Sequence, residues 1–122
     1  PDEVFEDQNW PGLDWKNKLA SHYRTAKIML GAINASYEAE TDKIIKDCAD
    51  LMGNKKSFHN VNVGVYFGKP DVTVDDPYFN GKGPVRTGCV LCGGCMVGCR
   101  YNAKNTLDKN YLYQHFYFPV KK

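Results

Sequence analysis

A long stretch between residues 68 and 98 limits the folds open to this chain more than any other feature. It is rich in glycine and aspartate, and Pro70, Pro77 and Pro84 interrupt it. Proline lacks the backbone N–H that helix interiors and central strands require, and glycine weakens both. We therefore expect a mostly irregular loop, and a loop of this length in a compact domain is usually functional or held by specific contacts.

Two helices are predicted before this loop, over residues 13–31 and 41–52. In both segments apolar side chains recur at steps of three and four residues, which places them on one face of a helix. The first stripe comprises Trp15, Leu19, Tyr23, Ala26 and Leu30, and the second comprises Ile44, Ile45, Cys48, Leu51 and Met52. Gly31 and Gly53 suit the ends of these helices.

The remaining regular elements are a strand and a short helix. In residues 60–67 the period changes to two, which predicts a strand with one buried face, formed by Val61, Val63, Val65 and Phe67. A short helix is expected over 105–113, where Asn105 or Thr106 can cap its first turn. The acidic segment 1–12 contains Pro11 and Gly12 and is expected to be an extended arm.

Together these elements predict an α+β fold with two or three helices, one main strand and a long Cys/Gly-rich loop. We divide the 122 residues into an arm (1–12), a helical and strand part (13–67), a Gly/Pro/Cys-rich loop (68–104) and a helix with a tail (105–122), all within a single partial domain. Hydrophobic residues make up 43% and charged residues 25%, which argues against global disorder. The chain has no run of ~18 apolar residues, so no transmembrane segment is expected. No secretory signal is recognisable, and a cytoplasmic location is expected.

Charge is unevenly distributed along the chain. The net charge is only +2, but residues 81–122 contain seven Lys or Arg residues and one acid, Asp108. An anionic partner could bind such a segment, but we favour the interpretation that it is a solvated positive surface. Aromatic and basic residues alternate there without forming a stacking platform, so we expect no nucleic-acid partner.

The strongest chemical signal is a group of closely spaced cysteines, Cys89, Cys92, Cys95 and Cys99. Their C-x2-C-x2-C-x3-C spacing matches the run that ligates iron–sulfur clusters in bacterial ferredoxins. Neighbouring glycines allow the backbone to curl around a shared centre. Arg100 and Lys104 add positive charge that favours thiolates over thiols. The four cysteines are therefore candidate ligands of a [4Fe–4S] cluster.

Two other interpretations of the cysteines stay open. Arg100 stands where ferredoxins have proline, and there is no second cysteine quartet, so one cubane would need Cys99 or a remote ligand such as Cys48. Zinc is a weaker option, because structural zinc sites usually separate two C-x2-C knuckles by a longer insert. The third interpretation is a purely structural, Gly-rich loop with no metal.

The other candidate residues give weaker signals. Cys48 lies on the apolar stripe of the second predicted helix, so we interpret it as a small core residue. His22, His59 and His115 follow no metal-binding spacing and are expected at the surface or its boundary. The chain contains neither a G-x-G-x-x-G turn after a strand nor a P-loop, so it has no dinucleotide fingerprint of its own.

The cysteine run from Gly88 to Arg100 and the Ala103–Leu112 segment that follows it form the most specific pattern in the sequence. Further characteristic segments lie upstream, at Trp10–Trp15, Tyr23, Met29–Gly31, Val63–Gly68 and Asp75–Phe79. Together these segments resemble the glucose–methanol–choline (GMC) oxidoreductases, and within them the cholesterol-oxidase-like members. The resemblance covers nearly everything from Phe5 to Tyr113.

The resemblance implies an FAD enzyme that oxidises an alcohol, with sterols as the expected substrate class, by hydride transfer to flavin. It also implies a two-domain fold that pairs an FAD-binding domain with a substrate domain. This chain would be an internal piece, mostly on the substrate side, that returns toward the FAD domain near Lys104–Leu112. Its partner would be the remainder of the enzyme.

The departures from the family limit what can be transferred. The Gly-rich FAD fingerprint and the catalytic histidine and asparagine of the family have no counterpart here, so we assign no catalytic residue and expect the isolated chain to be inactive. Residues 114–122 do not follow the family pattern, which a truncated or frame-shifted reading frame would explain. The alternative function, from the cysteine spacing alone, is a small iron–sulfur electron-transfer module.

Overall fold

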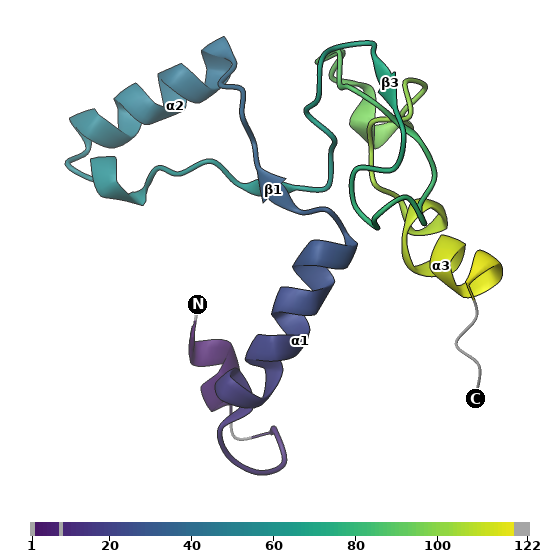
Figure 1. Cartoon of the computed structure of the whole chain (residues 1–122). Helices are drawn as coiled ribbons and strands as arrows, with labels where there is room; N and C mark the ends of the chain where they lie inside the picture. Colours follow the sequence, from purple (N-terminus) through teal and green to yellow (C-terminus); the bar gives the residue numbers. More distant parts are fainter. Residues whose placement is uncertain (1, 8, 119–122) are drawn as a thin grey trace.

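The computed structural model describes residues 2–7 and 9–118. Three α-helices and two pairs of two-residue strands account for the regular structure of these residues, together with short 3₁₀ helices (Figure 1). In chain order the elements are η1 (Asp2–Glu6), α1 (Trp15–Met29), β1 (Ile33–Asn34), α2 (Glu40–Leu51), η2 (Lys55–Ser57), β2 (Asn62–Val63), β3 (Thr73–Val74), β4 (Arg86–Thr87), η3 (Gly94–Met96), η4 (Leu107–Lys109) and α3 (Tyr111–Tyr117). The α+β prediction is confirmed.

Helices α1 and α2 confirm the two helices expected from the apolar periodicity, to within two residues at each end. Asp14 precedes α1, and its carbonyl accepts the N–H of Lys18 at 3.1 Å. At the start of α2 the side chain of Asp42 accepts the backbone N–H of Ala39 at 2.8 Å. The first contact is the first backbone hydrogen bond of α1, and the second satisfies an N–H group that a helix leaves unpaired in its first turn.

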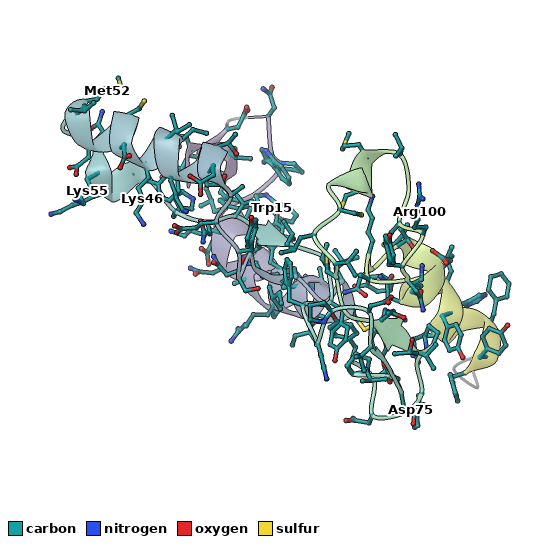
Figure 2. All side chains as sticks on the ribbon, turned by 90° about the horizontal axis from the view of Figure 1, so that it is seen from above. Trp15, Lys46, Met52, Lys55, Asp75 and Arg100 are labelled. Carbon is teal, nitrogen blue, oxygen red and sulfur yellow. The ribbon has the colours of Figure 1, made fainter. Side chains whose placement is uncertain are left out.

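The apolar stripe of α2 is not covered, contrary to the expectation of a core-facing helix. Ile44 and Ile45 are 61% and 58% exposed, and Leu51 and Met52 are more exposed still. The α2–η2 unit projects away from the rest of the chain (Figure 1). Figure 2 shows Met52 and Lys55 at one end of the molecule and Arg100 and Asp75 at the other. Periodicity identified the helix correctly, but most of its apolar face is exposed.

The strand expected over 60–67 is shorter than predicted. Only Asn62–Val63 forms a strand, β2, which pairs antiparallel with β1. At Gly64 the chain changes partner: the carbonyl of Gly64 accepts the N–H of Asn105 at 2.8 Å, and Val65 forms an isolated bridge with Lys104. A Cβ added to Gly64 would lie 3.2 Å from the carbonyl oxygen of Leu30. Gly64 therefore lies close to the end of α1 at the point where the chain changes partner.

The long loop is mostly irregular, as expected, and contains one small antiparallel pair. Thr73 pairs with Thr87, and Val74 pairs with Arg86, to form β3 and β4. Between the two strands, the side chain of Asp76 accepts the backbone N–H groups of Tyr78 and Phe79, and also those of two glycines in the same turn. One carboxylate thus orders the turn that the prolines and glycines leave without regular structure.

The predictions for both ends of the chain need correction. The helix expected over 105–113 is instead a 3₁₀ turn, η4, followed by α3, which begins at Tyr111 and ends at Tyr117. Asn110 separates them, with φ −134° and ψ −98°. Residues 2–6 of the predicted extended arm form the 3₁₀ helix η1, because Phe5 packs edge-to-face on Tyr23 of α1, with ring centroids 6.2 Å apart. Residues 119–122 of the predicted tail lie outside the described residues.

The hydrophobic core is thin. Among the described residues, the buried hydrophobic side chains are Val65 and Ala103, and the largest fully buried ones are Arg86 and Asn110. The accessible surface is 9620 Å², whereas a compact monomer of this mass would expose about 6,600 Å². Much apolar surface is therefore exposed. In the part of the chain that the structure describes, no helix is long and apolar enough to span a bilayer.

Candidate functional site

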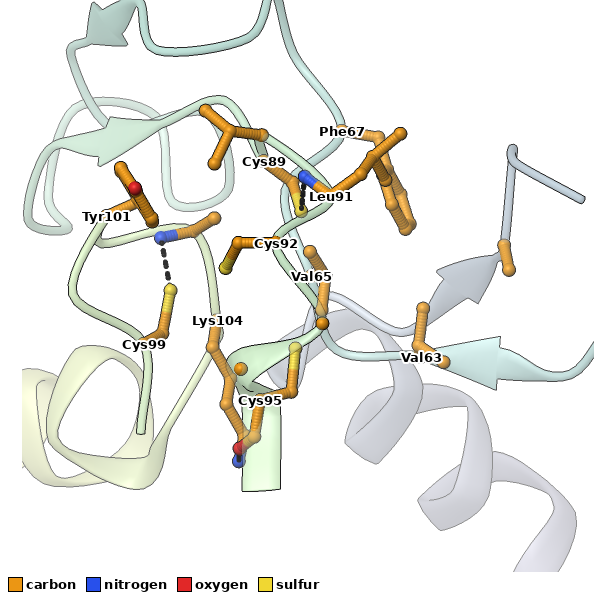
Figure 3. Close-up of a pocket in the computed structure, with 15 residues that line it drawn as sticks. Val63, Val65, Phe67, Cys89, Leu91, Cys92, Cys95, Cys99, Tyr101 and Lys104 are labelled. Carbon is orange, nitrogen blue, oxygen red and sulfur yellow. Dashed lines mark hydrogen bonds between the residues drawn. The ribbon is translucent and has the colours of Figure 1, made fainter. Parts of the chain in front are cut away.

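The four closely spaced cysteines line one apolar cavity. The cavity has a volume of about 250 Å³, and the side chains of Cys89, Cys92, Cys95 and Cys99 all contribute to its wall (Figure 3). All four are free cysteines; Cys92 is exposed and the other three are half-buried. The sequence prediction that these residues lie together is confirmed.

The backbone of the cysteine loop curls through left-handed conformations. Leu91 has φ 56°, and the glycines at 93 and 98 have φ 70° and 110°. Leucine rarely adopts this conformation, which costs on the order of 1 kcal/mol. The turn at Leu91 aims its N–H at the Sγ of Cys89, at 3.4 Å. The strained residue of the loop, Leu91, is therefore also the one whose backbone N–H donates to a cysteine sulfur.

A second backbone donor contacts a cysteine at the other end of the loop. The N–H of Ala103 donates to the Sγ of Cys99 at 3.4 Å. Burial raises the pKa of the Cys99 thiol, but hydrogen bonds from the backbone of Lys104, Ala103 and Tyr101 outweigh it and lower the pKa below its ordinary value. Cys99 is therefore more readily ionised than a free cysteine.

Lys104 lies at the cavity and Arg100 does not. The Nζ of Lys104 donates to the carbonyl of Cys95 at 2.9 Å, and the lysine stem lines the cavity. Arg100 is exposed and is absent from the cavity wall. Of the two basic residues expected to favour thiolates, only Lys104 is placed to do so.

One short backbone segment connects both ends of the cysteine loop. The carbonyl of Tyr66 accepts the N–H of Cys89 at 3.0 Å, and the N–H of Tyr66 donates to the carbonyl of Ala103 at 2.8 Å. Val65, next to Tyr66, is buried and lines the cavity. The backbone of Tyr66, at the end of the predicted strand, therefore holds both ends of the cysteine loop in place.

Sequence reasoning missed a fully buried arginine. This residue connects the segment before the cysteine loop to the segment after it. Arg86 is 0% exposed, and its guanidinium donates to the side chain of Asn105 at 2.8 Å and to the carbonyls of Pro84, Val85 and Lys109 at 2.8, 3.1 and 2.8 Å. Burial lowers the pKa of Arg86. An arginine in a Gly/Pro-rich segment gives no sequence signal of burial, because its partners are backbone carbonyls.

Tyr78 completes this buried group. The guanidinium of Arg86 lies over the Tyr78 ring, 5.7 Å from its centroid. Burial raises the pKa of Tyr78. The end of α1 contacts the same ring, because a Cβ added at Gly31 would lie 2.7 Å from Cε1 of Tyr78. Arg86 and Tyr78 thereby connect the end of α1 to the chain segments on either side of the cysteine loop.

The remaining sequence candidates lie apart from the cavity. Cys48 is exposed on α2, so its interpretation as a core residue is wrong, for the same reason that the α2 stripe is uncovered. His59 Nδ1 lies 3.0 Å from the carbonyl of Ser57, and His22 and His115 are exposed. Within residues 2–7 and 9–118, no three His, Cys, Asp or Glu side chains are grouped closely enough to hold a single metal ion.

Comparison with known proteins identifies the relatives of the chain. Cholesterol oxidases of two Mycobacterium tuberculosis strains, CDC 1551 / Oshkosh and ATCC 25618 / H37Rv, are each 48% identical to it over 118 residues. A cholesterol oxidase of Acinetobacter baumannii is 41% identical over 121 residues. The chain is homologous to part of cholesterol oxidase.

The homology covers nearly all of this chain but only a small part of each relative. The match covers 92% of this chain and 20% of each M. tuberculosis cholesterol oxidase, and 93% and 21% for the A. baumannii protein. The chain therefore spans about a fifth of the length of these relatives. No family model matches the chain, and no solved structure matches it. The resemblance to cholesterol-oxidase-like proteins expected from the sequence is confirmed.

Proposed function

We propose that this chain is an internal segment of an FAD-dependent GMC oxidoreductase that oxidises the CH–OH group of an alcohol or sterol. The 48% identity to cholesterol oxidase over 92% of the chain carries this proposal. The name of the relatives suggests sterols as the substrate class. The segment contributes mainly to the substrate side of the enzyme.

The exposed apolar surfaces support a role inside a larger fold. Met96 and Val97 of the cysteine loop are 96% and 92% exposed, and Leu51 at the end of α2 is 89% exposed. Such exposed apolar side chains are typical of surfaces that pack against other protein. We infer that the remainder of the enzyme packs on α2 and on the outer side of the cysteine loop.

The described residues do not fit FAD by themselves. A flavin pyrophosphate needs free backbone N–H groups and positive potential at a helix N-terminus. Here α1 begins beside Asp14, and the first turn of α2 contains Glu40 and Asp42. At α3 the Asn110 side chain already accepts the N–H of Tyr111 at 2.6 Å. We therefore expect other parts of the enzyme to bind the flavin pyrophosphate.

A graft tests the proposal directly. Residues 5–113 replace the homologous segment of the M. tuberculosis cholesterol oxidase, and the chimera is assayed for flavin after desalting and for cholesterol oxidation. We expect the chimera to retain flavin and to oxidise cholesterol, because the segment supplies the same packing surfaces. The matched control is the same graft with Arg86→Met, which we expect to lose both properties.

Two outcomes would contradict the proposal. The first is a folded chimera that retains flavin but oxidises neither cholesterol nor a simpler alcohol. The second is a chimera that fails to fold although the host tolerates the A. baumannii segment at the same position. The alternative of a free-standing iron–sulfur module would account for the cysteine loop alone, whereas the homology extends over nearly the whole chain.

A further inference from the structure

We propose that Cys89, Cys92, Cys95 and Cys99 bind an iron–sulfur cluster of the cubane class inside the cavity that they line. This site is additional to the alcohol oxidation proposed above and does not depend on it. Three observations carry the proposal: the shared cavity, the donors that face the sulfurs, and the composition of the wall.

The cavity brings all four thiols to one space within a single loop. Its volume of about 250 Å³ is empty of protein, and the four cysteines of the C-x2-C-x2-C-x3-C run line it together (Figure 3). No disulfide links them. Four free thiols around one cavity are the ligand set that a [4Fe–4S] cluster requires.

Two backbone N–H groups and one lysine supply the electrostatic complement. A cubane with four thiolate ligands carries net negative charge, and hydrogen bonds to its sulfurs stabilise it. The N–H of Leu91 and the N–H of Ala103 each donate to a cysteine sulfur at 3.4 Å. Lys104 lies on the cavity wall, where its positive charge opposes that of the cluster. The strained backbone at Leu91 is explained if it serves to place the first of these donors.

The rest of the wall is apolar. Val63, Val65 and Phe67 come from the chain segment that supports the loop, and Leu91 comes from the loop itself. Apolar side chains around an iron–sulfur cluster exclude water and lower the local dielectric, which protects the cluster and sets its potential.

Anaerobic reconstitution of the full 122-residue chain tests the proposal. The chain is incubated with ferrous iron, sulfide and a thiol reductant, then desalted and analysed for iron, acid-labile sulfide and visible absorbance. We expect about four irons and four sulfides per chain and a broad band near ~400 nm. Cys92→Ser and Cys95→Ser should each lose most of the bound iron. Cys48→Ser is the matched control, because Cys48 lies on α2 outside the cavity, and it should retain the wild-type iron content.

The competing outcomes are separated by two further measurements. Zinc is offered in place of iron and sulfide, and free thiols are titrated before and after each incubation. Stoichiometric zinc binding without retained iron would overturn the proposal in favour of a zinc site. Retention of less than about one iron per chain, whether or not circular dichroism shows a folded chain, would leave a structural loop and also overturn it. Neither result bears on the graft into cholesterol oxidase, which reports flavin binding and alcohol oxidation.

Discussion

The Nε of Arg86 donates a 2.8 Å hydrogen bond to the Oδ1 of Asn105, and these two residues lie on either side of the cysteine loop. The guanidinium also binds the carbonyl of Lys109, so it holds the chain that enters the loop against the chain that leaves it. The cavity lined by the cysteines therefore depends on a residue that does not line it.

Replacing Arg86 by methionine should destabilise the chain strongly. The substitution leaves the carbonyls of Pro84, Val85 and Lys109 and the Asn105 side chain without their donor, at a cost of about 3 kcal/mol. Urea unfolding followed by circular dichroism measures the change. Arg100→Met is the control: Arg100 is exposed, and the change should stay within about 0.5 kcal/mol. Equal effects of the two substitutions would show that Arg86 is not a structural clamp.

Gly31→Ala should cost more than Gly53→Ala, although both glycines have positive φ. Gly31 has φ 56° and Gly53 has φ 72°. Because alanine is disfavoured in the left-handed conformation, either substitution should lower the free energy of unfolding by roughly 1–2 kcal/mol. At Gly31 the new Cβ would also collide with the side chains of Asn105 and Tyr78, whereas nothing lies within 4 Å at Gly53. Overpacking should add about 1–3 kcal/mol at Gly31.

Urea midpoints of the two glycine variants, compared at equal m-values, provide the measurement. A Gly31→Ala variant no less stable than Gly53→Ala would mean that the end of α1 does not pack against Tyr78. In that case the end of α1 would not be connected through Tyr78 to the chain segments on either side of the cysteine loop.

The Cys99 thiol should react with iodoacetamide at a lower pH than an ordinary thiol. Its folded-state pKa lies below its unfolded value because backbone N–H groups bind the thiolate more than burial opposes it. The lowered pKa of Cys99 therefore adds to the free energy of unfolding. This contribution is fully present above the unfolded pKa, about 8.5, and is lost as the pH falls through the folded pKa. Mass spectrometry of the alkylated apo chain as a function of pH gives the midpoint.

The control for this pH dependence is the same experiment in urea. Unfolding should raise the Cys99 midpoint toward the ordinary thiol value, and Cys99→Ala should remove the corresponding pH dependence of the unfolding free energy. A midpoint that does not change on unfolding would refute the role of the backbone donors.

The isolated chain should not retain FAD. Acidic residues occupy the first turn of α2, and the Asn110 side chain caps α3, so neither helix start offers the free N–H groups that a pyrophosphate binds. After incubation with FAD and desalting, the visible spectrum should show no flavin band. Stoichiometric flavin in the desalted chain would instead show a binding site that the structure does not contain.

Part of the fold and of the candidate site was predictable from the sequence, for a local reason. The helices α1 and α2 follow from an apolar period that only helical geometry satisfies. The irregular loop follows from Pro70, Pro77 and Pro84, which exclude regular structure by their own covalent geometry. The proximity of the four cysteines follows from their short spacing, because the chain between them is too short to separate them widely.

Tertiary structure decided which groups find partners. The strand predicted over 60–67 breaks at Gly64 because its hydrogen-bond partner changes from β1 to the segment at Asn105. The last helix begins at Tyr111 rather than at Asn105 because Arg86 binds the carbonyl of Lys109 and holds it out of a helical ladder. Periodicity, turn residues and spacing act between near neighbours and are therefore legible in the sequence. The burial of Arg86 and the exposure of the α2 stripe depend on which distant segments meet, and only the folded chain determines that.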